Sequence, residues 1–196
     1  MARNPVHVRD ALPVDAPVLV AMWRANTETI GRMAEPNVGA AVRAIGHLAL
    51  DPEKRLVVAE VDGDVVGVAY LVRAPLSPIH EETTVRVSHL FVNAEHRGRG
   101  IGRAMLSVAT AWADEKQASH LLVNVSAAAR EANRFLTRLG LASMATVRAA
   151  PVAALQQRLA KAEAVEVGDG HLVAERLRTV RRRQLTARTA RRYPVD

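Results

Sequence analysis

Cysteine is absent from this 196-residue chain, which excludes disulfide bonds, thiolate nucleophiles and cysteine-ligated zinc. Aromatic residues make up only 3% of the sequence, so the core must consist mainly of valine, leucine, alanine and isoleucine. No apolar run approaches the length of a bilayer span, and residues 1–5 lack the apolar stretch of a signal peptide. From these absences we expect a cytoplasmic protein without membrane contacts and without a cysteine-based metal site.

The remaining composition is that of an ordinary globular protein, because 49% of the residues are hydrophobic and 24% are charged. The length suffices for one good hydrophobic core. The net charge of +7 is unevenly placed, since residues 151–196 hold ten Lys/Arg against five Asp/Glu. We therefore predict two parts: a globular domain over residues 1–150 and a basic, mainly helical extension over residues 151–196.

The most informative stretch is a glycine-rich turn between a predicted strand and a predicted helix. Three glycines alternate there with other residues, in the order Arg97, Gly98, Arg99, Gly100, Ile101, Gly102, Arg103. Glycine permits a tight turn and a close approach of a ligand to the backbone. The first amides of a helix have no internal acceptor and lie at the positive end of its dipole. Because the arginines add charge and forked donors, the turn is predicted to hold a phosphate group.

The kind of phosphate ligand is narrowed by the motifs that the turn does not match. A Walker loop would end in Gly-Lys-Ser/Thr, and the glycines are not spaced as in the dinucleotide motif Gly-x-Gly-x-x-Gly. Residues 97–102 do fit Arg/Gln-x-x-Gly-x-Gly/Ala. This pattern resembles the pyrophosphate-binding signature of the GNAT superfamily of acyl-CoA-dependent N-acetyltransferases. The alternative is a basic turn before an ordinary helix, which the preceding strand and the following amphipathic helix disfavour.

Hydrophobic periodicity predicts the order strand, two helices, three strands, helix, strand, helix, strand, and so an α/β layer structure with a mixed sheet. Asp15 is predicted to cap the first helix, and Asp62-Gly63 to form a hairpin turn. The predicted strands are 6–9, 56–61, 65–72, 83–92, 121–125 and 141–150. The predicted helices begin at 16 and at 36, and two more cover 101–116 and 127–139.

A second stretch, residues 127–141, resembles the other GNAT signature, Asn-x-x-Ala-x-x-Phe/Leu-Tyr-x-x-x-Gly-Phe, because Ala132, Phe135 and Gly140 match it. With two matching signatures, the chain is identified as a member of this superfamily over roughly residues 6–150. The resemblance implies a three-layer fold with a mixed, mostly antiparallel sheet flanked by helices. It also implies that the fourth and fifth strands splay apart and that the acyl-CoA arm lies in the gap.

The resemblance further implies how acetyl-CoA, the co-substrate, is held. Its diphosphate would lie on the amides of residues 97–102, and its pantetheine arm would pair with the backbone of Leu90, Phe91 and Val92. The Val92 amide would stabilise the oxyanion as an amine attacks the thioester. Neither a covalent intermediate nor a metal is implied.

The acid and base of familiar relatives are missing by position. Arg86 stands where many members carry a glutamate, and Asn124 stands where ribosomal-protein alanine acetyltransferases carry one. The signature asparagine and the thiolate-protonating tyrosine are replaced by Ala129 and Leu136.

His89 is then the candidate base, because the pKa of an ordinary histidine suits proton transfer near neutral pH. A structural strand histidine is the alternative. His80, Glu81 and Glu82 are further candidates, with a solvated charged loop as their alternative, and water could also relay the proton.

The resulting hypothesis is an N-acetyltransferase that moves an acetyl group to a primary amine by direct attack in a ternary complex. The acceptor would be a small molecule or a peptide, with residues 23–38 as candidates for its selection. The alternative is a catalytically degenerate module that binds acyl-CoA or a partner. For the extension, we consider a homodimer contact, a mobile tail and a nucleic-acid contact, and the lack of an aromatic platform disfavours nucleic acid.

Overall fold

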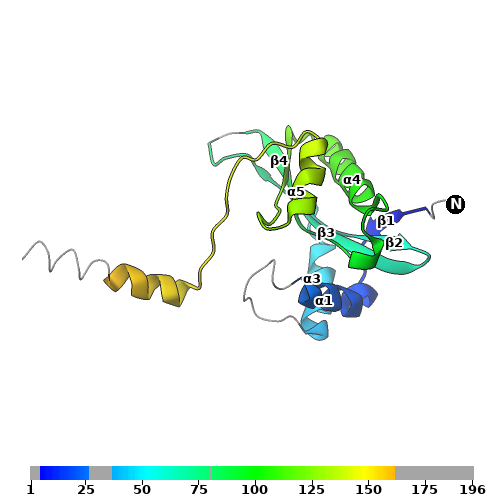
Figure 1. Cartoon of the computed structure of the whole chain (residues 1–196), viewed down its shortest axis with the longest axis horizontal. Coiled ribbons are helices and arrows are strands. Elements are labelled where there is room, and N and C mark those ends of the chain that lie inside the picture. The colour runs from blue at the N-terminus through cyan, green and yellow to red at the C-terminus, as the bar shows by residue number, and fades with distance from the viewer. Residues whose placement is uncertain (1–4, 27–36, 80, 162–196) are drawn as a thin grey trace, which may run out of the picture. The chain divides into compact units, whose positions relative to one another are not determined.

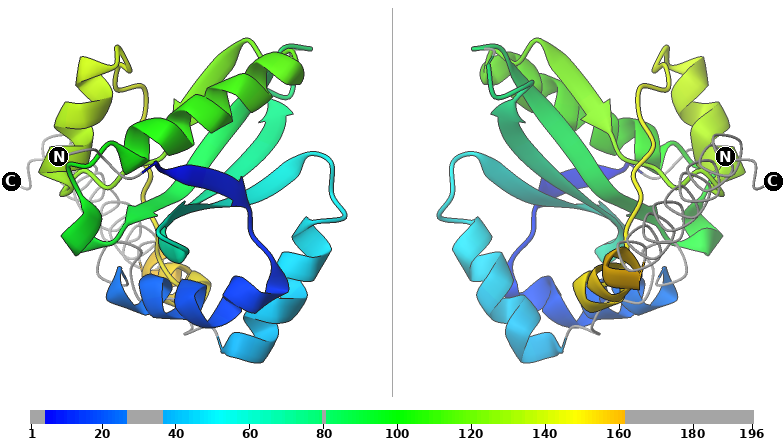
Figure 2. Two further views of the ribbon diagram at one scale, coloured as in Figure 1. Left: turned by 90° about the vertical axis from the view of Figure 1, so that its right-hand side faces the viewer. Right: turned by 90° about the vertical axis from the view of Figure 1, so that its left-hand side faces the viewer.

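The computed structural model describes residues 5–26, 37–79 and 81–161. The chain divides into two units, Met1–Ala142 and Ser143–Asp196. In the first unit a five-stranded sheet lies between helices (Figures 1 and 2). Its elements are β1 (His7–Asp10), η1 (Pro13–Asp15), α1 (Ala16–Ala25), α3 (Val38–Leu48), β2 (Lys54–Val61), β3 (Asp64–Pro75), β4 (Thr83–Val92), η2 (Ala94–His96), α4 (Ile101–Glu115), β5 (His120–Val123) and α5 (Arg130–Arg138). In the described part of the second unit, residues 152–161 are helical.

The strands follow one another across the sheet in chain order. Strands β1 to β4 pair antiparallel with their neighbours, whereas β5 pairs parallel with β4. This is the mixed, mostly antiparallel sheet that the sequence predicted. The predicted hairpin between β2 and β3 is also present, and both turn residues, Asp62 and Gly63, have positive φ angles of 57° and 87°. Two positive φ angles in succession match the right-handed twist of the flanking strands.

Each face of the sheet has its own hydrophobic core, which confirms the predicted layers. On one face, α4 buries Ile101, Met105 and Trp112 against β-branched residues of the central strands. On the opposite face, α1 and α3 bury Met22 and Ile45 together with sheet residues that point the other way. Figure 2 shows α4 over one face of the sheet and α1 with α3 over the other. Alternate residues of β2 and β3 therefore serve two cores.

Two local predictions are wrong. Residues 141–150 form no strand, and all except Leu141 are exposed, because this alanine-rich segment buries too little side-chain surface to add a strand to the sheet. Asp15 stands at the N-cap of α1 but does not cap it. Its carboxylate instead accepts hydrogen bonds from the Leu12 amide and the Arg9 guanidinium. Within the described ranges, no helix combines the length and the apolar character needed to cross a membrane.

Candidate active site

A bulge in β4 sets the geometry of the candidate site. Ser88 pairs with Tyr70 and Phe91 pairs with Val68, so His89 and Leu90 together oppose a single residue of β3. His89 has a φ of 53°, in the left-handed region. Such a conformation costs a non-glycine residue about 1–3 kcal/mol and persists only where the surrounding structure enforces it. The bulge therefore interrupts the regular alternation of β4 at His89.

Beyond the bulge, no strand of the described residues pairs with the outer edge of β4. The ladder with β5 ends at the pair Val87 and Val123. The Val87 carbonyl there accepts a hydrogen bond from the Asn124 amide at 2.8 Å. The Asn93 amide donates to β3, to Val66 at 2.9 Å. Because backbone groups alternate between the two edges of a strand, those of Leu90 and Val92 point to the edge that β5 leaves open. The pairing of β4 with β5 thus ends ahead of the bulge, as the family resemblance implied.

The glycine-rich turn holds a row of amides without a protein acceptor next to this edge. Gly98 and Gly100 have φ angles of 72° and 90°, which only glycine adopts readily, and a Cβ at either position would meet nothing within 4 Å. The first hydrogen bond of α4 runs from the Ala104 amide to the Gly100 carbonyl at 3.0 Å. In the part of the chain that the structure describes, the amides of residues 98–103 donate to no protein acceptor. Gly98, Arg99, Gly100 and Arg103 are exposed, whereas Ile101 is buried, so the amides of the exposed residues are available to an anion from outside.

Arg97 connects the turn to the strand edge. Its Nε donates to the carbonyl oxygen of Val92 at 3.2 Å, which occupies that carbonyl but not the Val92 amide. Arg99 and Arg103 are exposed beside the same turn. The amides and three guanidinium groups thus give this corner a concentrated positive potential.

On the face of the sheet opposite α4 lies a cavity of about 660 Å³ between α1, α3 and strands β2 to β4. His89 lies in its wall, with its ring stacked on Trp23 at a centroid distance of 4.7 Å and an interplanar angle of 24°. Phe91 meets the same ring edge-on at 6.1 Å. The Nδ1 atom of His89 lies 3.2 Å from the hydroxyl of Ser88. Strand and helix together therefore hold the imidazole in one orientation.

Burial lowers the pKa of His89 below its ordinary value, because the charged imidazolium loses solvation among these apolar neighbours. The imidazole is therefore uncharged at neutral pH. An uncharged, oriented imidazole at the edge of a cavity can accept a proton.

The other positions that the sequence singled out lie elsewhere. Asn124 is exposed just past the end of β5, and Arg86 is exposed on β4 ahead of the bulge. Glu81 and Glu82 precede β4, and Glu82 accepts a hydrogen bond from Ser119 at 3.3 Å, far along the strand from the bulge. Leu136 is buried under α4 in the core. His80 and residues 27–36 of the predicted selection segment lie outside the described residues.

Sequence reasoning missed two cavity-lining groups, Tyr70 and His47. Tyr70 stands on β3 opposite Ser88, and His47 stands in the last turn of α3. Neither belongs to a motif, and the chain separates them from His89 by 19 or more positions. Only the pairing of the strands and the packing of α3 on the sheet bring them to the same cavity.

Comparison with known proteins identifies the class to which this fold and site belong. Residues 21–141 match the family model described as "Acetyltransferase (GNAT) family". That match covers more than half of the chain, so the chain belongs to the GNAT acetyltransferase family and is of the acyltransferase class. No curated protein matches it significantly.

Solved structures of similar fold include a transcriptional regulator from Bacillus halodurans C-125, with a TM-score of 0.66 and 22% identity over 75% of this chain and 100% of that one. The ribosomal-protein-alanine N-acetyltransferase from Brucella melitensis biovar Abortus 2308 has a TM-score of 0.60 and 22% identity over 75% and 99% of the two chains. The aminoglycoside N-acetyltransferase AAC(6')-Iy, in complex with CoA, has a TM-score of 0.61 and 13% identity over 76% and 95%. At these identities the likeness shows a shared fold.

Proposed function

We propose that this protein transfers an acetyl group from acetyl-CoA to a primary amine in a ternary complex. The observation that carries the proposal is the row of free amides at residues 98–103 beside the open edge of β4. A diphosphate needs several donors at one place, and an amide-bearing pantetheine arm needs a strand edge. Both features occur here side by side, in a chain of the acetyltransferase family.

In this proposal the residues of the turn bind the diphosphate, and the backbone of Leu90, Phe91 and Val92 aligns the pantetheine arm. The thioester then lies next to the bulge. The Val92 amide donates to the carbonyl oxygen as negative charge develops on it. Much of the acceleration comes from holding the thioester and the amine in reach of each other.

The chemistry is a direct substitution at the thioester carbonyl. His89 accepts the proton of the ammonium form of the amine, since its depressed pKa keeps it uncharged at neutral pH. The uncharged amine nitrogen then forms a bond to the acetyl carbon, the carbon–sulfur bond breaks, and CoA leaves as a thiolate, which takes up the second proton from the nitrogen. A thiol with a pKa of about 8.5 is a good enough leaving group to depart without a protein acid. This is consistent with Leu136 in place of a tyrosine.

A second candidate function is an acyl-CoA-binding module without catalysis. The absence of a carboxylate at Arg86 and at Asn124 favours it. The two functions differ in one measurable property, the release of free CoA in the presence of an amine.

The experiment measures acetyl-CoA binding by calorimetry and CoA release with a thiol reagent over a panel of amines. Replacing Arg99 and Arg103 together with alanine should weaken acetyl-CoA binding about tenfold or more, because two charged contacts to phosphate are lost. Arg43→Ala, an exposed arginine on α3, is the control and should leave binding unchanged. Absence of saturable acetyl-CoA binding by the wild type would refute both functions. Binding without CoA release would select the second.

A further inference from the structure

Aromatic side chains are rare in this protein but concentrated in one place. The chain has two tryptophans, two tyrosines and two phenylalanines, and three of these six line the cavity beside His89. They are Trp23 of α1, Tyr70 of β3 and Phe91 of β4. A chain whose cores are mainly aliphatic has thus placed half of its aromatic residues around one opening.

Aliphatic side chains make up a further part of the wall. Leu19, Leu48, Leu56 and Val68 contribute aliphatic surface from the helices and the sheet. The volume of about 660 Å³ lies within the range of small-molecule sites, about 300–1,000 Å³. Such a wall favours a ligand with a flat, apolar body, since aromatic pairs contribute about 0.5–1.5 kcal/mol beyond the area that they bury.

The charges around the cavity disfavour a ligand with several positive charges. Asp51 is the one carboxylate among the described lining residues, and its Oδ2 lies 2.7 Å from the Nζ of Lys54. Its Oδ1 accepts the Glu53 amide at 3.0 Å. Lys54 also lines the cavity. The ion pair therefore leaves no unpaired carboxylate at Asp51 for a polycationic ligand, and Lys54 adds a positive charge that repels such a ligand. A single ammonium group can still be stabilised by the faces of the aromatic rings.

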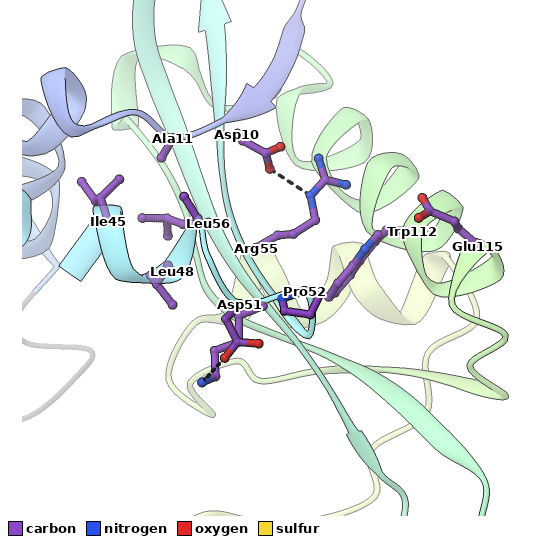
Figure 3. A pocket seen from close by; sticks show the side chains of 12 residues that line it. Asp10, Ala11, Ile45, Leu48, Asp51, Pro52, Arg55, Leu56, Trp112 and Glu115 are labelled. Atoms are coloured by element: carbon purple, nitrogen blue, oxygen red, sulfur yellow. Dashed lines mark hydrogen bonds and ion pairs between the residues drawn. The ribbon is translucent and has the colours of Figure 1, made fainter. Parts of the chain in front are cut away.

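A neighbouring hollow of about 380 Å³ has a different character (Figure 3). There Arg55 pairs with Asp10 at 2.9 Å, and its guanidinium lies 5.9 Å from the centre of the Trp112 ring. No residue of β4 lines this hollow. It therefore lacks contact with the strand on which a thioester would lie, and the aromatic cavity is the better acceptor site.

We infer that the acceptor is a primary amine whose single positive charge is carried on an aromatic body, bound in the cavity of Trp23, Tyr70 and Phe91. This inference rests on the proposed function, because the amine must reach a thioester at the β4 bulge. It goes beyond that function by excluding polyamines and other polycationic acceptors as preferred substrates.

The test compares three amines with the full-length wild-type protein and acetyl-CoA: phenethylamine, hexylamine and spermidine. We expect kcat/KM for phenethylamine to exceed that for hexylamine about fivefold, through aromatic contacts. It should exceed that for spermidine about a hundredfold or more, because burying extra unpaired charge is costly. Binding of each amine to the protein–CoA complex is measured in parallel by calorimetry.

Two variants make the test specific to the cavity. Trp23→Leu should raise the KM for phenethylamine about tenfold and abolish the preference over hexylamine, since the stacking surface is removed. Val14→Ala is the control, as Val14 is an exposed apolar residue of η1, 76% accessible, that does not line the cavity. Lys54→Met frees the Asp51 carboxylate and should raise the ratio of spermidine to phenethylamine turnover about tenfold.

The outcomes separate this inference from the proposed function. Turnover of amines with spermidine preferred, or without any preference, overturns the inference and leaves the acetyltransferase proposal standing. Saturable phenethylamine binding that Trp23→Leu weakens, without turnover of any amine, supports the inference about the cavity and overturns the proposed catalysis. Absence of phenethylamine binding together with absence of turnover of any amine overturns both.

Discussion

At the scale of single residues, His89 combines three features that rarely coincide. It has a positive φ in a strand, its ring stacks on a tryptophan, and it lies in the wall of a cavity. A strained backbone held in place by its surroundings is a common property of functional sites. Its role as a base is testable through the pH dependence of activity, because burial lowers its pKa.

We expect His89→Gln to lower kcat about 10²–10⁴-fold, the usual contribution of general base catalysis, with little change in acetyl-CoA affinity. In the wild type, kcat/KM should rise as pH increases through the pKa of His89 and level off above it, since only the uncharged imidazole accepts a proton. That pKa lies below the ordinary histidine value. His120→Gln, an exposed histidine at the start of β5, is the control and should keep wild-type activity. An unchanged pH profile in His89→Gln would contradict the assignment.

Asp15 is a second residue whose environment has measurable consequences. It is 6% exposed, and its oxygens accept from Arg9 Nη1 at 2.7 Å and Nη2 at 2.9 Å. Arg9 also donates to Glu60 at 2.6 Å. The Arg9 hydrogen bonds hold the pKa of Asp15 below its usual value, despite its burial. The network ties β1 and β2 to the start of α1.

Asp15→Asn should lower the free energy of unfolding by about 2 kcal/mol at pH 7, because charge-assisted hydrogen bonds are lost from a buried site. The folded-state pKa of Asp15 is depressed, so its stabilisation is present above the unfolded pKa and lost as pH falls through the folded value. Urea unfolding should therefore show the two proteins converging as the pH drops below about 4. Asp10→Asn, which breaks a more exposed pair with Arg55, should change stability much less.

At the scale of elements, the close approach of α4 to β3 positions the glycine-rich turn. A Cβ at Gly67 would lie 3.0 Å from Met105 Sδ, 3.2 Å from the Phe91 carbonyl oxygen and 3.3 Å from Ile101 Cγ2. Two of these neighbours belong to the first turns of α4 and the third to β4. The absence of a side chain at Gly67 thus lets the helix N-terminus lie against the sheet.

Gly67→Ala should reduce the free energy of unfolding by about 1–3 kcal/mol through overpacking, and should weaken acetyl-CoA binding as the first turn of α4 is displaced. Gly46→Ala in α3 is the matched control, since a Cβ there meets nothing within 4 Å. That substitution should instead stabilise the protein by about 0.5–1 kcal/mol, as expected for alanine in a helix. Thermal unfolding and calorimetry would check both, and equal effects of the two would contradict the packing argument.

At the scale of the whole molecule, the described hydrophobic core lies within the first unit. Its buried members run from Ala11 to Leu136, and Leu141 packs against them from just past α5. Both candidate sites, the turn of α4 and the aromatic cavity, are built from residues of this unit.

A chain ending at Ala142 should therefore keep its free energy of unfolding within about 0.5 kcal/mol of the full chain and should bind acetyl-CoA with the same affinity. Ending the chain at Arg138 should destabilise it, because the Leu141 side chain and the hydrogen bond from the Leu141 amide to the Leu136 carbonyl are lost. Urea denaturation of both truncations makes the comparison. A large loss of stability in the chain ending at Ala142 would show that residues 143–196 contribute to this unit.

Much of this architecture could be predicted from local patterns. Asp62-Gly63 predicted its hairpin, the arginine–glycine run predicted the start of α4, and the apolar periods predicted the layers. The predicted strand at 141–150 was wrong because periodicity cannot tell whether a segment will find enough surface to bury. The alternation near Ala59 and His89 is broken by bulges that no local pattern announced.

The sequence by itself determined the family, the order of elements as far as α5 and the place of the glycine-rich turn, because each depends on neighbours within a few positions along the chain. Only the tertiary structure decided that Trp23, Tyr70 and His89 share one cavity and that Lys54 neutralises Asp51 at its wall. These contacts join α1, α3 and strands that are distant in the chain, so they depend on strand register and helix packing. The choice of acceptor depends on those contacts, and therefore on the folded protein.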